Sequence, residues 1–333
     1  MTGAAFRLAG TGIGLPAKRV TSRDLDRQLG KPTGWLEAEC GVAERYVCEH
    51  ESQDDLAVTA ATSALQCAGM MARDVDLIVF AASVGKQPIP ATAPLIARRL
   101  GIAGGACAAF DVNATCLGFV TAFDLAGTYI GLGRYECALV VSSEIASRAL
   151  PWASDPATAG LFGDGAAAAV LTQAGSDCAS HIAAARFETY PEGYDLCRLA
   201  AGGTGIDYHR DDAAFHAASW FAMDGRELFK LSAKHFPGFV DRLLDAAGWQ
   251  REHVDCVVPH QASPLALDHL VKRCRFPRER VIDIVATSGN QIAASIPMAL
   301  HVARERGLVR QGAKVLLLGT SAGVSFGGLA IEI

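Results

Sequence analysis

The sequence lacks the features that would place it in a membrane or on nucleic acid. It has no run of about 18 or more uncharged apolar residues, so no transmembrane helix is expected. A formal net charge of −5 over 333 residues provides no basic surface for nucleic acid or anionic lipid. The N-terminus has no charged region followed by an apolar core, as a secretory signal would require. We therefore expect a cytoplasmic protein that binds neither nucleic acid nor a membrane.

Motifs for metals and nucleotides are also missing. None of the ten cysteines belongs to a C-x-x-C pair, so neither a zinc site nor a dithiol redox motif is indicated. The Gly-rich turns contain no G-x-x-x-x-G-K sequence and no dinucleotide fingerprint after a strand. We expect no metal and no bound cofactor, and we expect most cysteines to be reduced side chains in the core.

A helix–turn–strand pattern, by contrast, is present twice. In each copy an amphipathic helix ends at a glycine and is followed by a continuous apolar strand. Three matches recur in the same order roughly 175 residues further on, which favours duplicated halves over chance similarity. The matched pairs are Ala68-Gly69 with Ala247-Gly248, Asp111-Val112 with Asp283-Ile284, and Gly131-Leu132 with Gly307-Leu308.

The duplication predicts the domain organisation. We assign residues 1–174 to an N-terminal half, residues 217–333 to a C-terminal half, and residues 175–216 to a connecting loop with a β excursion. Strands that alternate with helices imply an α/β fold with mainly parallel sheets, covered on both faces. Two such halves side by side give stacked layers. The two most apolar helices, which begin near Cys116 and near Asn290, belong in the middle layer.

Cys116 stands at the head of the first of these apolar helices. Only Thr121, Asp124 and Thr128 interrupt the apolar segment, so we expect the helix to be buried on nearly all sides. A thiol at a helix start meets unpaired backbone N–H groups and the positive end of the helix dipole. Both favour the thiolate, so we predict a lowered pKa and a nucleophilic sulfur at Cys116. The alternative is a plain buried cysteine.

Two further polar residues occupy comparable positions. His260 follows the apolar strand Cys256–Pro259, and Asn290 stands at the head of the second apolar helix. In open α/β sheets, ligand sites form where the carboxyl ends of strands meet the starts of helices. A lone histidine is often structural and an asparagine after glycine is often a cap. The combination of Cys116, His260 and Asn290 nevertheless favours catalysis by a thiol.

Six motifs give the sequence a family resemblance. It resembles the condensing enzymes of the thiolase superfamily, and within them the β-ketoacyl-acyl-carrier-protein synthase III family. The motifs occur in the family's order along the whole chain, and together they are specific. They are DVNATCLGF around Cys116, LFGDGAAAAVL at 161–171, FAMDGRELFK at 221–230, VVPHQAS at 257–263, TSGNQIAASIPMAL at 287–300 and GTSAGVSFGG at 319–328.

The resemblance implies a fold, an activity and a set of roles. The fold is thiolase-like, with five layers (αβαβα) and two duplicated halves, and it usually forms a homodimer. The activity is acyl transfer to Cys116, followed by decarboxylative Claisen condensation with a malonyl thioester, in fatty-acid initiation or secondary metabolism. His260 and Asn290 act on the malonyl group, and the backbone N–H groups of Cys116 and Ala322 form the oxyanion hole. Acyl-carrier-protein or coenzyme A thioesters are the implied substrates.

The residues implied to recognise the carrier depart in part from the family pattern. Trp35 matches a tryptophan that stacks on the adenine of coenzyme A, but Glu39 stands where an arginine is expected. Ser263-Pro264-Leu265 replaces the usual Asn-Leu-Arg after the histidine. Because arginine grips phosphate through its planar fork, recognition of coenzyme A in the usual manner is not expected.

Other positions concern the acyl chain and the carrier protein. Ile89 stands where relatives commonly carry a phenylalanine that reaches the partner subunit's acyl pocket. Phe229 lies within the matched FAMDGRELFK segment and is assigned to substrate binding. Lys272 and Arg273 match a basic pair that docks the acidic carrier protein; the alternative is a solvated helix face.

Three other functions remain open. An acyltransferase of the same fold would move the acyl group to an alcohol or amine. Enzymes that join two acyl thioesters without decarboxylation place a glutamate at the position of Ile89. A non-catalytic partner subunit would not require an intact Cys116.

Overall fold

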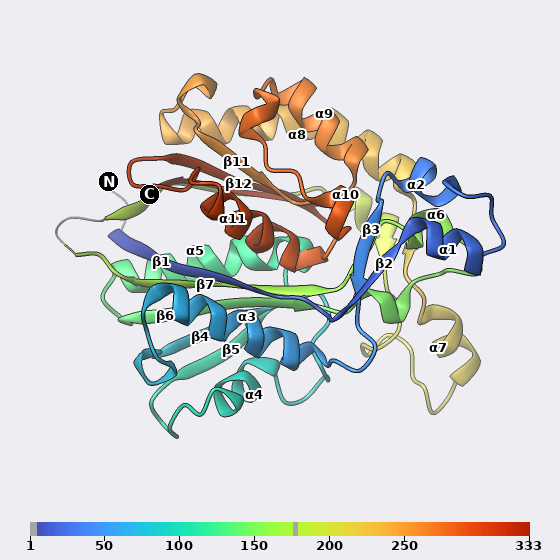
Figure 1. Ribbon diagram of the computed structural model, residues 1–333, viewed down its shortest axis with the longest axis horizontal. Coiled ribbons are helices and arrows are strands. Elements are labelled where there is room, and N and C mark those ends of the chain that lie inside the picture. The colour runs from blue at the N-terminus through green and yellow to red at the C-terminus, as the bar shows by residue number, and fades with distance from the viewer. Residues whose placement is uncertain (1–4, 176–178) are drawn as a thin grey trace.

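The computed structural model describes residues 5–175 and 179–333; residues 1–4 and 176–178, including Cys178, lie outside the described part. A mixed sheet runs through the protein (Figure 1). Its strands are β1 (Ala5–Gly14), β4 (Leu77–Ala81), β5 (Ala108–Val112), β6 (Cys137–Glu144), β7 (Gly165–Gln173), β8 (Ser180–Thr189), β11 (Cys256–Pro259), β12 (Lys314–Ser321) and β13 (Ser325–Glu332).

The strand order has an internal symmetry. Outward from β1 it runs β1-β7-β6-β4-β5, and outward from β8 it runs β8-β13-β12-β11. On each side the first two pairings are antiparallel and the next is parallel. Val281 forms a parallel bridge to Val257 of β11, in the place that β5 takes beside β4. Among the described strands, the two sets pair with each other only where the first residues of β1 meet the first residues of β8.

Helices cover both sets of strands, which gives five layers. A helix pair lies between the sets, and another pair covers each outer face (Figure 1). No helix in the described part of the chain is long and apolar enough to cross a membrane. The inner pair is α5 (Gly118–Gly131) and α11 (Ser295–Glu305); the outer pairs are α3 (Gln53–Ala68) with α4 (Thr92–Arg99), and α8 (Gly225–Ala247) with α9 (Pro264–Cys274).

The alternation of side chains along the strands explains this layering. In β4, Leu77 and Val79 pack into the middle layer, whereas Ile78 and Phe80 pack against α3 and α4. In β12 the odd-numbered Val315 and Leu317 face the middle layer, and the even-numbered residues face α8. Both faces of these strands are therefore apolar, which accounts for their continuous apolar runs in the sequence.

One expectation from the sequence needs correction. The sheet is mixed rather than mainly parallel, because β7 runs antiparallel to β6. Ser180–Thr189, within the segment assigned to a connecting loop with a β excursion, forms β8 and pairs along β13 in the large sheet. The side chains of β8 are mostly half-buried or exposed, so the sequence carries no apolar pattern that would mark a strand of the large sheet. The predicted boundaries at residues 174 and 216 stay predictions.

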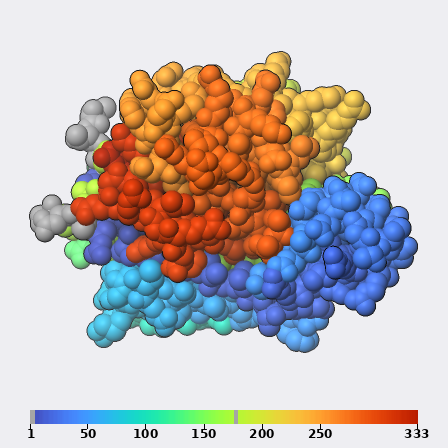
Figure 2. Space-filling view, turned by 45° about the horizontal axis from the view of Figure 1, so that its top comes forward, coloured from blue at the N-terminus to red at the C-terminus, as the bar shows by residue number. Residues whose placement is uncertain are grey.

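Shorter elements surround the strand ends near the middle helices. Figure 2 shows the N-terminal segment, in blue, against the orange part of the C-terminal half. Leu36 of α2 packs there with Leu267 of α9, and Ala43 N donates to Ala286 O over 2.8 Å. The shorter elements are β2 (Lys18–Thr21), α1 (Ser22–Gln28), α2 (Trp35–Cys40), β3 (Glu44–Val47), α6 (Pro156–Ala159), β9 (Cys197–Arg198), α7 (Asp212–Ala218), β10 (Ala222–Met223) and α10 (Val285–Ser288).

Candidate active site

Cys116 lies in a tight turn between β5 and α5. The turn is a 3-10 segment, Thr115–Leu117, and α5 begins directly after it at Gly118. Thr115 has φ of 49°, a left-handed conformation that is unusual for a β-branched residue. The Asn113 side chain supports the turn, because its Oδ1 accepts a hydrogen bond from Thr115 N at 3.0 Å. The thiol therefore stands in front of the helix rather than inside it.

Asn290 opens an equivalent turn in the second half. Its Oδ1 accepts a hydrogen bond from Ile292 N at 2.8 Å, and Ile292 again has φ of 49°. The 3-10 segment Ile292–Ala294 then leads into α11. Because Oδ1 is held by a backbone donor, the orientation of the amide is set. Nδ2 has one contact in the described chain, a long one of 3.4 Å to Ala262 O.

The LFGDG motif holds Asn290 in place. Asn290 N donates to Leu161 O at 2.7 Å, and Gly163 N donates to Asn290 O at 3.1 Å. A Cβ at Gly163 would lie 2.3 Å from Ser288 O, so only glycine permits this close approach. The motif at 161–171 therefore supports the turn that carries the amide.

His260 lies close to both turns. It follows β11, is 6% exposed, and donates its backbone N–H to Leu318 O at 2.7 Å. A Cβ at Gly319 would lie 3.5 Å from His260 Cβ and 2.8 Å from Leu117 Cδ2, so His260 and the Cys116 turn flank the same glycine. The Asn290 amide reaches Ala262, two residues beyond the histidine. The structure thus gathers the three predicted residues around the end of β12.

Ala322 completes this group. It lies in the turn between β12 and β13, and its backbone group interacts with the Cys116 sulfur. Ser321 Oγ donates to Ala114 O at 3.0 Å, which fastens this turn to the one that carries Cys116. The backbone N–H of Cys116 itself also acts on the sulfur. Two backbone donors therefore face the position predicted for an oxyanion hole.

The predicted lowering of the Cys116 pKa is wrong. Burial raises the pKa of the thiol well above its usual range, and nearby Cys197 and Glu144 raise it further. The backbone groups of Ala322 and Cys116 oppose this shift without reversing it. Since desolvation disfavours the charged form, the resting nucleophile is a neutral thiol.

Burial also keeps His260 neutral. It lowers the pKa of the imidazole to about 4. Within the described chain, His260 Nδ1 is buried without a hydrogen-bond partner. At neutral pH the imidazole therefore has one N–H to donate and no positive charge.

The sequence analysis missed two neighbours of Cys116. Glu144 ends β6 and is 2% exposed, and Cys197 belongs to the short strand β9. Both act on the Cys116 thiol. A single charged residue at the end of an otherwise uncharged strand was the available signal for Glu144. Nothing in the sequence distinguished Cys197 from the other cysteines.

The remaining predicted residues lie at the surface or between helices. Trp35 begins α2, and Lys31 Nζ lies 4.8 Å from the centre of its ring. Ile89 is 87% exposed in the loop between β4 and α4. Phe229 of α8 packs its ring edge against His269 of α9, with centroids 5.0 Å apart. Lys272 and Arg273 are exposed in the last turn of α9. No contact joins these residues to Cys116, so their roles stay predictions.

The fold and the gathered residues define a thiolase-like condensing enzyme. Residues 110–191 match the family described as 3-oxoacyl-[acyl-carrier-protein] synthase III, and residues 244–333 match its C-terminal domain. The chain is 36% identical over 328 residues to β-ketoacyl-[acyl-carrier-protein] synthase III 3 of Streptomyces coelicolor, covering 97% of this chain and 96% of that one. It is 33% identical to the synthase III of Neisseria meningitidis, with 98% of each chain covered. The chain belongs to the β-ketoacyl-[acyl-carrier-protein] synthase III family, a family of acyltransferases.

Solved structures agree with this assignment. The synthase III of Aquifex aeolicus superimposes with a TM-score of 0.87 at 31% identity, covering 98% of this chain and all of that one. The enzyme of Pseudomonas aeruginosa gives a TM-score of 0.86 at 33% identity, with 98% of each chain covered. Xanthomonas campestris OleA, at 23% identity and a TM-score of 0.85, shares the fold. The predicted family and fold class are confirmed.

Buried His260 makes stability depend on pH. Because its pKa falls from 6.5 in the unfolded chain to about 4 in the folded protein, the unfolded state binds more protons between these values. The free energy of unfolding should therefore decrease as the pH falls through this window. Between pH 7 and pH 4, the free energy of unfolding of the wild-type protein should fall by about 3 kcal/mol more than that of His260→Gln. Urea titrations at both pH values measure this difference.

The control for this experiment is His50→Gln, which removes an exposed imidazole. If the free energy of unfolding changed with pH equally in wild type and His260→Gln, the imidazole would not be held neutral by burial.

Proposed function

We propose that the protein forms a carbon–carbon bond by decarboxylative Claisen condensation, with Cys116 carrying the acyl group. The observation that carries the proposal is the grouping of half-buried Cys116, two backbone donors, neutral His260 and the Asn290 amide around the end of β12. Each step uses only thioester substrates and protein groups, so we propose that no cofactor is required. The chemistry fits the start of a fatty acyl chain or of a related secondary metabolite.

In the first half-reaction Cys116 attacks an acyl thioester. A C–S bond forms to Cys116, the bond to the carrier sulfur breaks, and the thiol proton leaves with the carrier thiol. The backbone N–H groups of Cys116 and Ala322 stabilise the tetrahedral oxyanion, a contribution of about 3 kcal/mol per well-placed donor. The raised pKa of the thiol makes this stabilisation important, because the sulfur does not start as a thiolate.

In the second half-reaction a malonyl thioester loses carbon dioxide. The electron pair of the broken C–C bond forms an enolate, whose oxygen accepts hydrogen bonds from the His260 imidazole and the Asn290 amide. A neutral imidazole suits this role, since it donates without protonating the carbanion. The enolate carbon then attacks the acyl-Cys116 carbonyl, and the released Cys116 thiolate takes one proton from solvent.

Asn290→Ala should separate the two half-reactions. Acylation of Cys116 should stay within about threefold of wild type, whereas carbon dioxide release should fall about a hundredfold, because the lost donor acts only on the enolate. Wild type, Asn290→Ala and Cys116→Ala are incubated with malonyl-carrier protein and a panel of acyl thioesters. Mass spectrometry of the Cys116 peptide and trapped carbon dioxide report the two steps.

The other candidate functions give different results in the same assay. Acylation of wild-type Cys116 without malonyl turnover would identify an acyltransferase to an alcohol or amine. An acylated protein that joins two acyl thioesters without malonyl consumption would identify non-decarboxylative condensation. No acylation would identify a non-catalytic subunit. If Asn290→Ala lost both half-reactions equally, the proposed role of Asn290 in the second half-reaction alone would be contradicted.

We infer that the acyl donor is a carrier-protein thioester rather than coenzyme A. Lys31 covers one face of the Trp35 ring, where a purine would otherwise stack. Glu37 and Glu39 are exposed on the same short helix and would repel phosphates. Lys272 and Arg273 form no ion pair with any described residue, which leaves them available to an acidic carrier protein.

Charge reversal on α9 tests this inference. Lys272→Glu with Arg273→Glu should lower kcat/KM for acyl-carrier protein at least tenfold, on the order of the loss expected from removing electrostatic steering. Acylation of Cys116 by a small acyl thioester should not change, because that step involves no carrier protein and the reacting groups are untouched. Arg73→Glu, on the opposite outer layer, is the matched control. A wild-type preference for acyl-coenzyme A would contradict the inference.

We propose that two copies pair along β5. This strand ends the sheet, and its five residues are all half-buried without a strand on the outer side in the described chain. Ala108 N bonds inward to Asp76 O, so the neighbouring Ala109 N–H points to the free edge. An unpaired edge of this kind is a template for pairing with a second copy. Pairing there would also bring the exposed Ile89 loop near the partner.

Ala109→Pro should convert the dimer to a monomer, because proline removes the outward N–H. Ala109→Val keeps that N–H and is the control. Light scattering after size exclusion should give about twice the chain mass of 34.9 kDa for wild type and control, and about the chain mass for the proline variant. A wild-type monomer would contradict the proposal.

A further inference from the structure

The carboxyl of Glu144 is enclosed between the two turns that carry Cys116 and Asn290. Its Oε1 accepts a hydrogen bond from Ser83 N at 2.6 Å, and its Oε2 accepts one from Ser83 Oγ at 2.8 Å. A third hydrogen bond comes from Ala293 N. Burial raises the pKa of Glu144 to about 8, although these hydrogen bonds oppose the rise. A buried carboxyl with three donors is held in one orientation.

One arm of this network leads to the nucleophile. Ser83 O accepts a hydrogen bond from Asn113 Nδ2 at 3.1 Å, and Asn113 Oδ1 accepts one from Thr115 N at 3.0 Å. Thr115 directly precedes Cys116. The carboxyl of Glu144 is therefore connected to the Cys116 turn through Ser83 and one asparagine side chain.

The other arm leads to the Asn290 amide. Ala293 follows Ile292, whose N–H donates to Asn290 Oδ1 at 2.8 Å. Thr115 and Ile292, both β-branched, have φ of 49°, a left-handed conformation that β-branched residues normally avoid. Such turns persist only where their surroundings hold them, and Glu144 is bonded to the surroundings of both.

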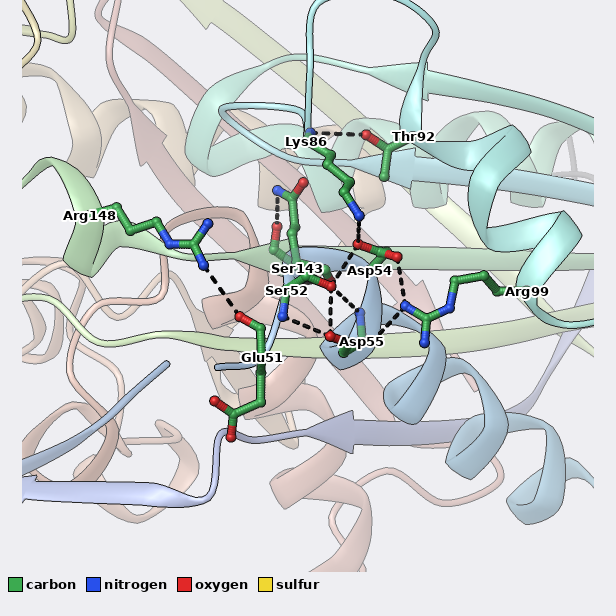
Figure 3. Close-up of polar contacts among 10 residues, drawn as sticks. Glu51, Ser52, Asp54, Asp55, Lys86, Thr92, Arg99, Ser143 and Arg148 are labelled. Atoms are coloured by element: carbon green, nitrogen blue, oxygen red, sulfur yellow. Dashed lines mark hydrogen bonds and ion pairs between the residues drawn. The ribbon is translucent and has the colours of Figure 1, made fainter. Parts of the chain in front are cut away.

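The Ser83 segment is itself anchored from the opposite face of the sheet. Gln53 Nε2 donates to Val84 O at 2.7 Å and to Ser143 O at 2.8 Å. Asp54 binds Lys86 Nζ at 2.5 Å and Arg99 Nη1 at 2.6 Å, as Figure 3 shows. The start of α3 therefore fixes the segment that Glu144 holds from the middle layer.

We propose that Glu144 is a positioning residue, whose carboxyl links the Cys116 turn to the Asn290 turn and so sets the spacing between the acyl-carrying sulfur and the groups that hold the enolate. This inference rests on the proposed condensation. Acylation needs the Cys116 turn and Ala322, whereas carbon–carbon bond formation needs both turns in register. A loss of register therefore reduces condensation more than acylation.

The test compares Glu144→Ala, Glu144→Gln and Asp76→Asn. In Glu144→Ala the rate of carbon dioxide release should fall at least tenfold more than the rate of acylation, on the order expected for a misplacement near 1 Å. Glu144→Gln keeps an acceptor for Ser83 N and should restore most of the balance. Asp76 is a half-buried carboxyl before the other end of β6 that accepts hydrogen bonds from Glu136 N at 2.7 Å and Cys137 N at 3.0 Å, so Asp76→Asn controls for the change of a carboxyl that holds backbone donors away from the site. It should affect both half-reactions equally.

Hydrogen exchange provides a readout that needs no substrate. In Glu144→Ala, peptides that contain Thr115 and Ile292 should both exchange roughly tenfold faster than in wild type, and neither should change in Asp76→Asn. Loosening of one turn alone, or equal loss of both half-reactions, would overturn the positioning role. A wild-type protein without acylation or carbon dioxide release would refute the proposed condensation, and the exchange data would still decide whether Glu144 joins the turns.

Discussion

The site depends on two left-handed turns that face each other at the starts of the buried helices α5 and α11. Each turn places a β-branched residue at φ of 49°, against its intrinsic preference, and each is supported by an asparagine two residues earlier. The turn moves the following side chain out of the helix and toward the strand ends. Without this conformation Cys116 would point elsewhere, and the two halves would not present their groups to one another.

The same burial that builds the middle layer decides the charge states in the site. It raises the pKa of Cys116 and lowers the pKa of His260, so the resting groups are a thiol and a neutral imidazole. Neutral donors suit an enolate, which needs stabilisation without protonation. A neutral thiol is a poorer nucleophile, and in the proposed acylation the backbone groups of Cys116 and Ala322, which act on the sulfur, would stabilise the charge that develops. On this proposal, burial favours the second half-reaction and makes the first depend on preorganised donors.

The sequence predicts those features of the site that depend on local interactions, and it does not predict those that depend on tertiary contacts. Cys116, His260 and Asn290 were identifiable because each polar residue interrupts or follows an apolar segment at a strand or helix end. The positive φ of Thr115 and Ile292 could not be predicted from the sequence, since β-branched residues normally avoid it and only tertiary contacts enforce it. The Cys116 pKa was mispredicted because the position at a helix start is local, whereas the rise comes first from desolvation by burial and then from the nearby Cys197 and Glu144, which only the fold brings close. A β excursion was predicted between residues 175 and 216, but the pairing of β8 within the large sheet was not, because its half-exposed residues carry no continuous apolar signal.

The two halves have kept the same turn and given it different tasks. Asn113 corresponds to Asn290, and Cys116 corresponds to Ala293, when the turns are superimposed on their left-handed residues. The Asn113 amide is engaged at both ends, by Ser83 O and Thr115 N, so it has only a supporting role. The Asn290 amide uses Oδ1 in the same way, but its Nδ2 has only the 3.4 Å contact to Ala262 O. One asparagine therefore serves the fold alone, whereas its counterpart uses its oxygen for the fold and, in the proposed condensation, its nitrogen for the substrate. On that proposal, this difference in neighbours is enough for a duplicated scaffold to turn a structural cap into a reactive group.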